Sequence, residues 1–196
     1  AHKFHGPKGV GMLYARRGII LTNLIEGGAQ ERGKRGGTEN VPGIAAMAAA
    51  LKEACANMDE NTKKVAALRD RLIDGIAKIP HCALNGARSP RLPGNVNFCF
   101  EGIEGESMLL LLDGKGICAS SGSACTSGSL DPSHVLLAIG RPHEVAHGSL
   151  RLTICEDNTE EEIDYILAEL PPIVSYLRDM SPVWKDLMSG KRQFTL

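Results

Sequence analysis

The stretch Ser120-Ser121-Gly122-Ser123-Ala124-Cys125-Thr126-Ser127-Gly128-Ser129 separates a short hydrophobic segment from a longer one in the second half of the chain. Its small polar residues offer the Cys125 thiol almost nothing apolar to pack against, whereas free cysteines are usually buried as small hydrophobes. Glycine and serine favour a mobile loop, and loops carry much of protein function. The pattern predicts a loop that presents a reactive thiol, although an ordinary flexible loop with an incidental cysteine would have the same composition.

Hydrophobic periodicity on both sides of this loop predicts an α/β fold. We expect helices over residues 42–58, 61–79, 106–112, 132–139 and 160–177, and strands over residues 10–15, 19–21, 82–84, 95–100, 117–119 and 149–154. The apolar stripes expected in the core are Val65, Leu68, Leu72, Ile76 and Ile79 in one helix and Ile163, Ile166, Leu167, Leu170, Val174 and Leu177 in another. A composition shift near Asp59-Glu60-Asn61 predicts two domains, over residues 1–60 and 61–196.

The segment Ser149-Leu150-Arg151-Leu152-Thr153-Ile154 alternates with a period of two, which places Arg151 on the face opposite the three aliphatic side chains. A guanidinium on a rigid strand is well suited to gripping a carboxylate with two parallel hydrogen bonds. A solvated sheet face would show the same alternation.

The chain opens with Ala1-His2-Lys3-Phe4-His5-Gly6-Pro7-Lys8-Gly9-Val10-Gly11, in which glycine and proline predict a tight turn. A partly desolvated lysine between histidine and phenylalanine is a candidate for Schiff-base chemistry with a carbonyl, although most lysines are solvated surface charges.

The segment 30–42 reads Gln30-Glu31-Arg32-Gly33-Lys34-Arg35-Gly36-Gly37-Thr38-Glu39-Asn40-Val41-Pro42 and ends where a helix is expected. Free backbone amides, the helix dipole and nearby cations would cradle a phosphate there. A simple helix entry explains the same letters, because Asn40 is a good N-cap and Pro42 suits the first turn.

Composition excludes several classes of protein. A net charge of −1 gives no reason to expect nucleic acid or an anionic membrane as a partner, and no stretch is long and apolar enough for a bilayer span. Cysteines at 55, 82, 99, 118, 125 and 155 show no CxxC pairing, so no metal site or disulfide framework is expected. We expect all but Cys125 to be core thiols, His134, His143 and His147 to be capping or surface residues, and the compartment to be the cytoplasm.

Together these segments resemble the pyridoxal-phosphate-dependent cysteine desulfurases of the NifS/IscS group, within the fold-type I aminotransferase-like enzymes. The resemblance rests on the lysine motif from His2 to Gly9, on Arg35-Gly36-Gly37-Thr38, on the Cys125 motif and on Ser149-Leu150-Arg151. It implies a fold-type I transferase in which residues 1–60 end the large cofactor-binding domain and residues 61–196 form the small C-terminal α+β domain. Since family members carry a long segment before the lysine motif, we expect this chain to be a C-terminal portion.

The resemblance also implies roles for individual residues. Lys3 would hold pyridoxal 5'-phosphate and act as the base at Cα, His2 would pack beside the cofactor, and Thr38 would bind its phosphate in the neighbouring subunit of a homodimer. Arg151 would fix the carboxylate of L-cysteine, and Cys125 would take up its sulfur as a persulfide, releasing L-alanine. The expected partner is a sulfur acceptor or a scaffold protein for iron–sulfur cluster assembly, and Cys125 is a candidate transient ligand of such a cluster.

Two alternatives remain, and a third is less favoured. A selenocysteine lyase would share Lys3 and Arg151, whereas a non-catalytic sulfur-carrier or interaction module would need only Cys125. An iron–sulfur scaffold protein would require several closely placed cysteine ligands.

Overall fold

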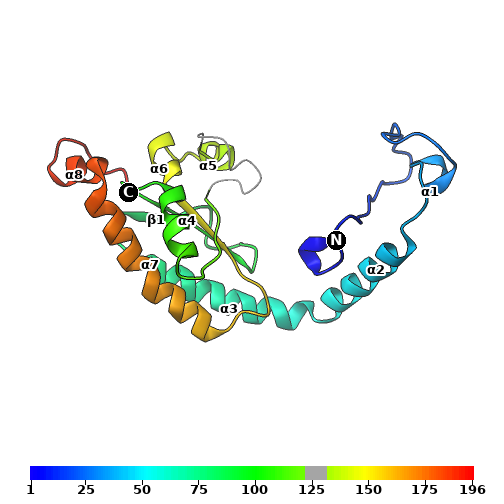
Figure 1. Ribbon diagram of the computed structural model, residues 1–196, viewed down its shortest axis with the longest axis horizontal. Coiled ribbons are helices and arrows are strands. Elements are labelled where there is room, and N and C mark those ends of the chain that lie inside the picture. Colours follow the sequence, from blue (N-terminus) through cyan, green and yellow to red (C-terminus); the bar gives the residue numbers. More distant parts are fainter. Residues whose placement is uncertain (122–131) are drawn as a thin grey trace. The chain divides into compact units, whose positions relative to one another are not determined.

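The computed structural model describes residues 1–121 and 132–196 (Figure 1). It divides the chain into two compact units, which we call unit 1 (Ala1–Asp59) and unit 2 (Glu60–Leu196). The division lies beside the composition shift at Asp59-Glu60-Asn61.

Unit 1 contains little regular structure apart from one long helix. Its elements are the 3-10 helix η1 (His2–Phe4), the short α1 (Gln30–Gly33) and α2 (Val41–Ala56). The predicted helix over residues 42–58 is confirmed by α2, and so is its cap, because Asn40 Oδ1 accepts a hydrogen bond from the Gly43 amide at 3.1 Å. Pro42 lies in the first turn, where its missing N–H costs nothing.

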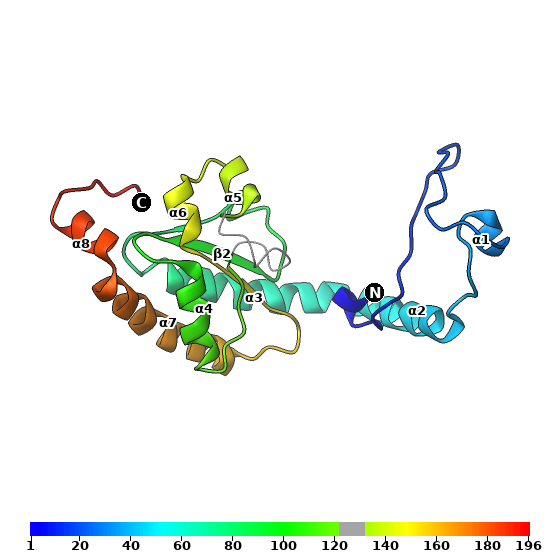
Figure 2. The same ribbon diagram turned by 45° about the horizontal axis from the view of Figure 1, so that its top comes forward.

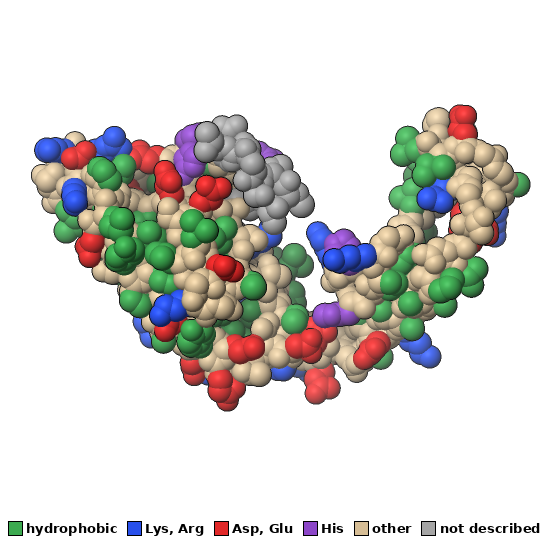
Figure 3. Space-filling model, viewed as in Figure 1, with side chains coloured by type: hydrophobic (Ala, Val, Ile, Leu, Met, Phe, Trp, Pro, Cys, Tyr) green, Lys and Arg blue, Asp and Glu red, His purple; other side chains and the backbone are tan. Residues whose placement is uncertain are grey.

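The strands expected over residues 10–15 and 19–21 are absent, and that prediction is wrong. Both segments are irregular, and every residue of unit 1 is described, so the unit offers no strand for them to pair with. Their apolar side chains remain exposed, with Leu13 at 80% and Ile20 at 92% of full exposure. Hydrophobic side chains accordingly stand on the surface of this unit (Figure 3). A hydrophobic pattern favours a strand only where a neighbouring strand can satisfy its backbone groups.

Unit 2 is built on a three-stranded antiparallel sheet in the order β1-β2-β3. The strands are β1 (Cys82–Leu84), β2 (Asn95–Phe100) and β3 (Ser149–Thr153), which match three of the predicted strands closely. The helices are α3 (Met58–Ile76), α4 (Gly105–Asp113), α5 (His134–Ala138), α6 (His143–His147), α7 (Glu160–Met180) and α8 (Pro182–Met188). Four of these were predicted, α3, α4, α5 and α7, whereas α6 and α8 were not.

The two faces of the sheet differ as the period-two patterns predict. On one face Phe98, Phe100 and Leu150 pack with side chains from α3, α4 and α7 into the main core, and the predicted stripes of α3 and α7 lie in or against it. On the other face Cys99 packs with a smaller cluster from α5 and α6. Figures 1 and 2 show α5 and α6 across the sheet from α3 and α7. The second face is therefore only partly covered by apolar residues.

Two further expectations, on residues 117–119 and on two of the thiols, are corrected. Residues 117–119 form no strand; only Ser120 bridges to β3, at Arg151. Cys55 and Cys118 are exposed and are not core thiols, since each lies on the outer side of its segment. No helix in the described part of the chain is long and apolar enough to cross a membrane.

Candidate functional site

Arg151 lies on the less covered face of the sheet, as its place in the alternating strand predicts. Leu150 and Leu152 are buried on the core face, while Arg151 is half-buried on the other. Its backbone exchanges two hydrogen bonds with Ser120, at 3.0 Å and 2.6 Å, and its Nη2 donates to Ser120 Oγ at 3.3 Å. The first residue of the Cys125 motif is thus joined to the arginine strand by three hydrogen bonds.

Arg151 lines an open pocket of about 460 Å³. The floor is the sheet, including Asn97 on β2. The walls are residues 85–87 and 90–92 on one side and helix α5 with its preceding residue Ser133 on the other. Two arginines, Arg91 and Arg151, reach this pocket, so it suits an anion.

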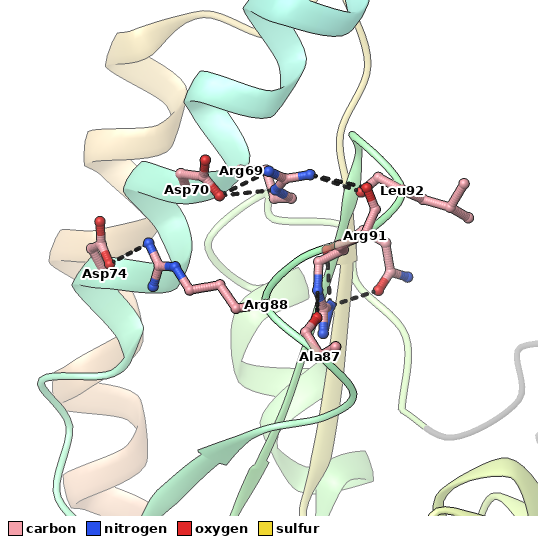
Figure 4. Close-up of polar contacts among 8 residues, drawn as sticks. Arg69, Asp70, Asp74, Ala87, Arg88, Arg91 and Leu92 are labelled. Carbon is pink, nitrogen blue, oxygen red and sulfur yellow. Dashed lines mark hydrogen bonds and ion pairs between the residues drawn. The ribbon is translucent and has the colours of Figure 1, made fainter.

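The loop 85–92, which carries the wall residues on one side of the pocket, is held in place by the guanidinium groups of Arg69 and Arg91 (Figure 4). Arg91 Nε donates to the Ala87 carbonyl at 2.9 Å, its Nη1 reaches both oxygens of Asn95, and its Nη2 donates to the Asn85 carbonyl. From α3, Arg69 Nη1 donates to the carbonyls of Arg91 and Leu92 at 3.3 Å and 3.2 Å. Burial first, and the positive charge of Arg69 second, lower the pKa of Arg91.

These contacts separate the roles of the two pocket arginines. The N–H groups of Arg91 donate to atoms of the pocket wall. Among the described residues, the Arg151 side chain donates only to the Ser120 hydroxyl. Arg151 is therefore the guanidinium with free donors for a bound carboxylate.

In unit 1, His2 and Lys3 lie on η1, and the turn that follows brings the chain back on itself. The amides of Phe4 and Gly6 both donate to the Ala1 carbonyl at 3.1 Å, and His5 adopts the left-handed conformation with φ of 65°. The tight turn is confirmed. Lys3 and His2 are both exposed, and Lys3 makes no hydrogen bond or ion pair with a described residue, so the expected partial desolvation of its amine is absent from this structure.

The Arg35-Gly36-Gly37-Thr38 segment passes close to another part of the backbone. Gly36 is buried and its amide donates to the Ile25 carbonyl at 3.0 Å; a Cβ at this position would lie 2.7 Å from the Glu26 oxygen. Only glycine fits there without a shift in the backbone. Thr38 follows with an exposed side chain.

The donors available for a phosphate in this segment differ from those expected. In the first turn of α2, the Val41 amide donates to Glu39, Pro42 has no amide hydrogen, and the Gly43 amide donates to Asn40 Oδ1. The helix terminus is therefore capped internally, which favours the capping interpretation for these first-turn amides. The amides of Gly37 and Thr38 and the Thr38 hydroxyl make no hydrogen bond to a described residue and remain available.

Cys125 lies outside the described residues, but Ser121 of its motif is described. A Cβ on Gly105, at the start of α4, would lie 2.7 Å from both Ser121 Cβ and the Ser149 oxygen. Glycine at this position therefore lets α4 begin directly beneath the segment that leads to Cys125.

The other thiols and the histidines show no catalytic arrangement. Burial raises the pKa values of Cys82 and Cys99, which keeps both thiols protonated at neutral pH. His134 and His143 are exposed, and the rings of His143 and His147 meet edge-on at 4.7 Å. Within the described ranges, no three His, Cys, Asp or Glu side chains come together to hold a metal ion.

Sequence reasoning did not identify Asn85, Asn97 and Arg141, which form a connected polar group at the pocket floor. The alternation of β2 was a usable signal for Asn97, since it shares a face with the odd-numbered residues of that strand. Nothing local pointed to Asn85 or Arg141, whose contact joins segments 56 positions apart.

The chain matches the aminotransferase class-V family over residues 1–166. It belongs to this family, whose enzymes use pyridoxal phosphate on the fold-type I architecture that the sequence predicts. It is 58% identical, over 98% of its length, to the cysteine desulfurase IscS of Clostridium botulinum, and 52% identical, over 93%, to the cysteine desulfurase NifS of Azotobacter vinelandii. It covers 49% and 46% of those proteins, so it spans about half the length of the curated relatives it matches.

Solved structures agree with this assignment. A NifS-like protein superposes with a TM-score of 0.80 at 39% identity, over 90% of this chain and 45% of that one. A NifS-like protein from Rickettsia africae gives a TM-score of 0.72 at 29% identity, over 80% of this chain and 41% of that one. The residues present fit the cofactor, because the Lys3 amine, the Thr38 hydroxyl and the amides of residues 37–38 make no hydrogen bond to any described residue and can hold its aldehyde and phosphate groups.

Proposed function

We propose that this chain is part of a pyridoxal-phosphate-dependent cysteine desulfurase, which converts L-cysteine to L-alanine and passes the sulfur on as a persulfide of Cys125. The observation that carries the proposal is the attachment of Ser120, the first residue of the Cys125 motif, to Arg151 by three hydrogen bonds. This attachment couples the residue suited to binding a substrate carboxylate to the segment that bears the thiol. Similarity to relatives named cysteine desulfurase supports the same reaction.

Each candidate residue then has a task. Lys3 would hold the cofactor covalently through its amine and would accept the Cα proton of the substrate, and His2, on the same turn, would pack beside the ring. The cofactor, when bound, supplies the electron-withdrawing ring that makes this proton acidic. Thr38 and the free amides of residues 37–38 would bind the phosphate. Arg151 would orient the substrate by its carboxylate.

Transfer of sulfur from L-cysteine to Cys125 needs no external oxidant, because the carbon that loses the sulfur is reduced. The Cys125 thiolate attacks the substrate sulfur and forms an S–S bond while the Cβ–S bond breaks. The electron pair of that bond stays on the Cβ carbon, which takes up a proton and becomes the methyl group of L-alanine. The thiolate is the nucleophile, so Cys125 must be deprotonated at this step.

The finer features of the enzyme are also proposals. We propose a cytoplasmic homodimer in which Thr38 serves the neighbouring subunit's site, and a sulfur-acceptor or scaffold protein for iron–sulfur cluster assembly as the partner. The relatives' name, cysteine desulfurase, supports sulfur transfer to an acceptor. Borohydride reduction of the link between cofactor and lysine can be carried out equally on a longer protein that contains this chain.

The test is product analysis with L-cysteine on the cofactor-loaded protein. We expect L-alanine and a persulfide that maps to Cys125, and we expect Cys125→Ser to lower sulfur release about a thousandfold or more. Cys118→Ser, which removes an exposed thiol from outside the motif, is the matched control and should keep full activity. Borohydride reduction should fix the cofactor on Lys3, and Lys3→Ala should lose this label whereas Lys8→Ala should retain it.

Two results would overturn the proposal. Absence of L-alanine from L-cysteine would exclude desulfurase activity. Strong preference for L-selenocysteine, with turnover independent of Cys125, would identify a selenocysteine lyase instead.

A further inference from the structure

Asn97 lies directly beside Arg151 on the floor of the pocket. The two residues are register partners on β2 and β3, so their side chains leave the same face of the sheet. Directly opposed residues in an antiparallel pair have Cβ atoms about 5 Å apart, close enough for both side chains to contact one small ligand. Both residues line the pocket described above.

A one-way hydrogen-bond chain fixes the orientation of the Asn97 amide. It begins at Arg141, whose guanidinium can only donate and whose Nε lies 2.7 Å from Asn85 Oδ1. Because Asn85 Oδ1 accepts from Arg141, Asn85 must present its Nδ2 to its next neighbour. Asn85 Nδ2 lies 2.6 Å from Asn97 Oδ1, so Asn97 is the acceptor in that bond.

This hydrogen-bond chain from Arg141 through Asn85 to Asn97 is held rigidly at the base of the pocket. Asn85 retains only 5% of its full exposure, and its Nδ2 also contacts Cys99 Sγ at 3.2 Å. Arg141 is anchored further by a hydrogen bond from Nη2 to the Leu84 carbonyl at 2.6 Å. A buried amide in such a network does not flip readily, because a flip would place Nδ2 against a guanidinium.

The outer end of the chain is a free donor. Asn97 Oδ1 is used by Asn85, and no described residue accepts a hydrogen bond from Asn97 Nδ2. Asn97 is half-buried and lines the pocket, so its Nδ2 is accessible from the open pocket. The pocket floor therefore presents a guanidinium and an amide NH₂ group next to each other, and both can only donate.

We propose that Asn97 supplies a second hydrogen-bond donor to the carboxylate of the amino-acid substrate, beside Arg151, and that Arg141 acts through Asn85 as a positioning residue. This inference rests on the proposed function, since it assumes an amino-acid substrate whose carboxylate meets Arg151. Two donors from adjacent strands fix the plane of a carboxylate more closely than one guanidinium does.

The test compares two substrates on the cofactor-loaded protein, L-cysteine and its methyl ester, which has no free carboxylate. We expect Asn97→Ala to raise the KM for L-cysteine about tenfold or more, as for loss of a hydrogen bond to a charged group, with a smaller change in kcat. The KM for the methyl ester should stay unchanged. Binding of L-alanine, measured by calorimetry, should weaken by a similar factor and provides a readout independent of turnover.

Asn97→Asp is the sharper variant, because its carboxylate still accepts the Asn85 hydrogen bond while the outward donor is lost. It should bind L-cysteine and L-alanine more weakly than Asn97→Ala, since it places a negative charge beside the substrate carboxylate. Arg141→Gln should raise the KM for L-cysteine less than Asn97→Ala does, and Arg141→Lys should restore most of the affinity by again donating to Asn85. Arg71→Gln, which removes an exposed guanidinium of α3 that pairs with Glu160 at 2.8 Å away from the pocket lining, is the control and should match wild type.

The outcomes distinguish the inference from the proposed function. If wild type forms no L-alanine from L-cysteine, the proposed function fails. If wild type is active but both Asn97 variants bind L-cysteine and L-alanine as wild type does, the inference is wrong. It is also wrong if they weaken the ester and L-cysteine equally, because the amide would then act on something other than the carboxylate.

Discussion

Units 1 and 2 solve the problem of holding functional side chains in opposite ways. Unit 2 buries its main core on one face of its sheet, and Arg151 is fixed on β3, an outer strand of that sheet. In unit 1, where every residue is described, no hydrophobic side chain is buried. His2 and Lys3 lie on the short η1, Thr38 lies in an irregular segment, and all three side chains are exposed. The proposed carboxylate site is therefore pre-organised by its own unit, whereas the residues proposed to hold the cofactor are not.

The difference indicates that the stability of the fold comes mainly from unit 2, whereas unit 1 contributes residues held only by local backbone contacts. Local backbone geometry is well defined in unit 1, at the capped start of α2 and at the Gly36 crossing, although apolar packing is lacking. Core substitutions in unit 2 should consequently affect global unfolding, whereas substitutions in unit 1 should affect cofactor binding and leave global unfolding unchanged. The single tryptophan, Trp184, lies in unit 2 against Arg178, His81 and Phe194, so its fluorescence follows the unfolding of that unit.

The largest expected effect comes from removing a core aromatic side chain. Phe98 retains 2% of its exposure at the centre of β2, so Phe98→Ala should lower the free energy of unfolding by about 3–5 kcal/mol. Leu24, at 98% exposure in unit 1, provides the contrast, and Leu24→Ala should change it by less than about 0.5 kcal/mol. Urea titration followed by Trp184 fluorescence measures both. Equal losses would break the comparison between the units.

A smaller effect is expected from two arginines that donate to backbone carbonyls. Arg178 is buried, donates to the carbonyls of Pro80, His81 and Glu101 at 2.8, 2.8 and 3.2 Å, and lies 4.1 Å from the ring centre of Trp184. Arg178→Ala removes all three hydrogen bonds, and only the His81 carbonyl keeps another donor, the Glu101 amide at 3.0 Å; the change should cost about 3 kcal/mol. Arg35, which donates to Gly36 from an exposed position, should tolerate the same change. Because the fluorophore contacts Arg178, circular dichroism should be used for this pair.

Helix caps allow a closer comparison, since both units contain one. In unit 2, Thr159 and Glu162 form a reciprocal capping box at the start of α7, and Thr159→Ala should cost about 1 kcal/mol of unfolding free energy. In unit 1, Asn40→Ala removes the cap of α2 and should leave the Trp184-monitored transition unchanged. It should instead loosen the approach to Thr38, which hydrogen exchange at the Gly43 amide would detect. A shift of the Trp184 transition by Asn40→Ala would mean that the two units unfold together.

How far sequence reasoning reached follows the same division. In unit 2 the alternation of Asn95–Phe100 and Ser149–Thr153 predicted both the strands and the face that carries Arg151. Each strand shows this alternation in its own sequence, because one face of the sheet is buried. In unit 1 the alternation-free apolar residues 10–15 and 19–21 were read as strands, but pairing depends on a partner that local sequence does not reveal. The cap at Asn40 was one of two uses that the sequence left open, although its donor lies only three residues away.

The candidate site shows the same limit. Arg151 and the Cys125 motif were identified from local composition, whereas the Arg141–Asn85 contact joins positions 56 apart and depends on how α5 and α6 pack over the sheet. The use of the first-turn amides of α2 was equally hidden, since the same letters suit an anion site and a capped helix. Contacts that depend on tertiary packing, and choices between two uses of one donor, required the structure.

The smallest effect that we predict is a pH dependence carried by the thiols of unit 2. Burial raises the pKa values of Cys82 and Cys99 above that of an unfolded thiol, about 8.5, and nearby Arg178 and Arg141 offset this only in part. The protonated thiols therefore contribute stability that is fully present below about pH 8.5. Above it the unfolded chain loses these protons first, so the free energy of unfolding should fall as the pH rises toward the folded-state pKa values. Measured between about pH 7 and pH 10, the double variant Cys82→Ala, Cys99→Ala should fall less steeply than wild type, while Cys55→Ala, which removes an exposed thiol of unit 1, should follow wild type. A parallel fall in the double variant would assign the alkaline loss to other groups and remove the thiols from the contrast between the units.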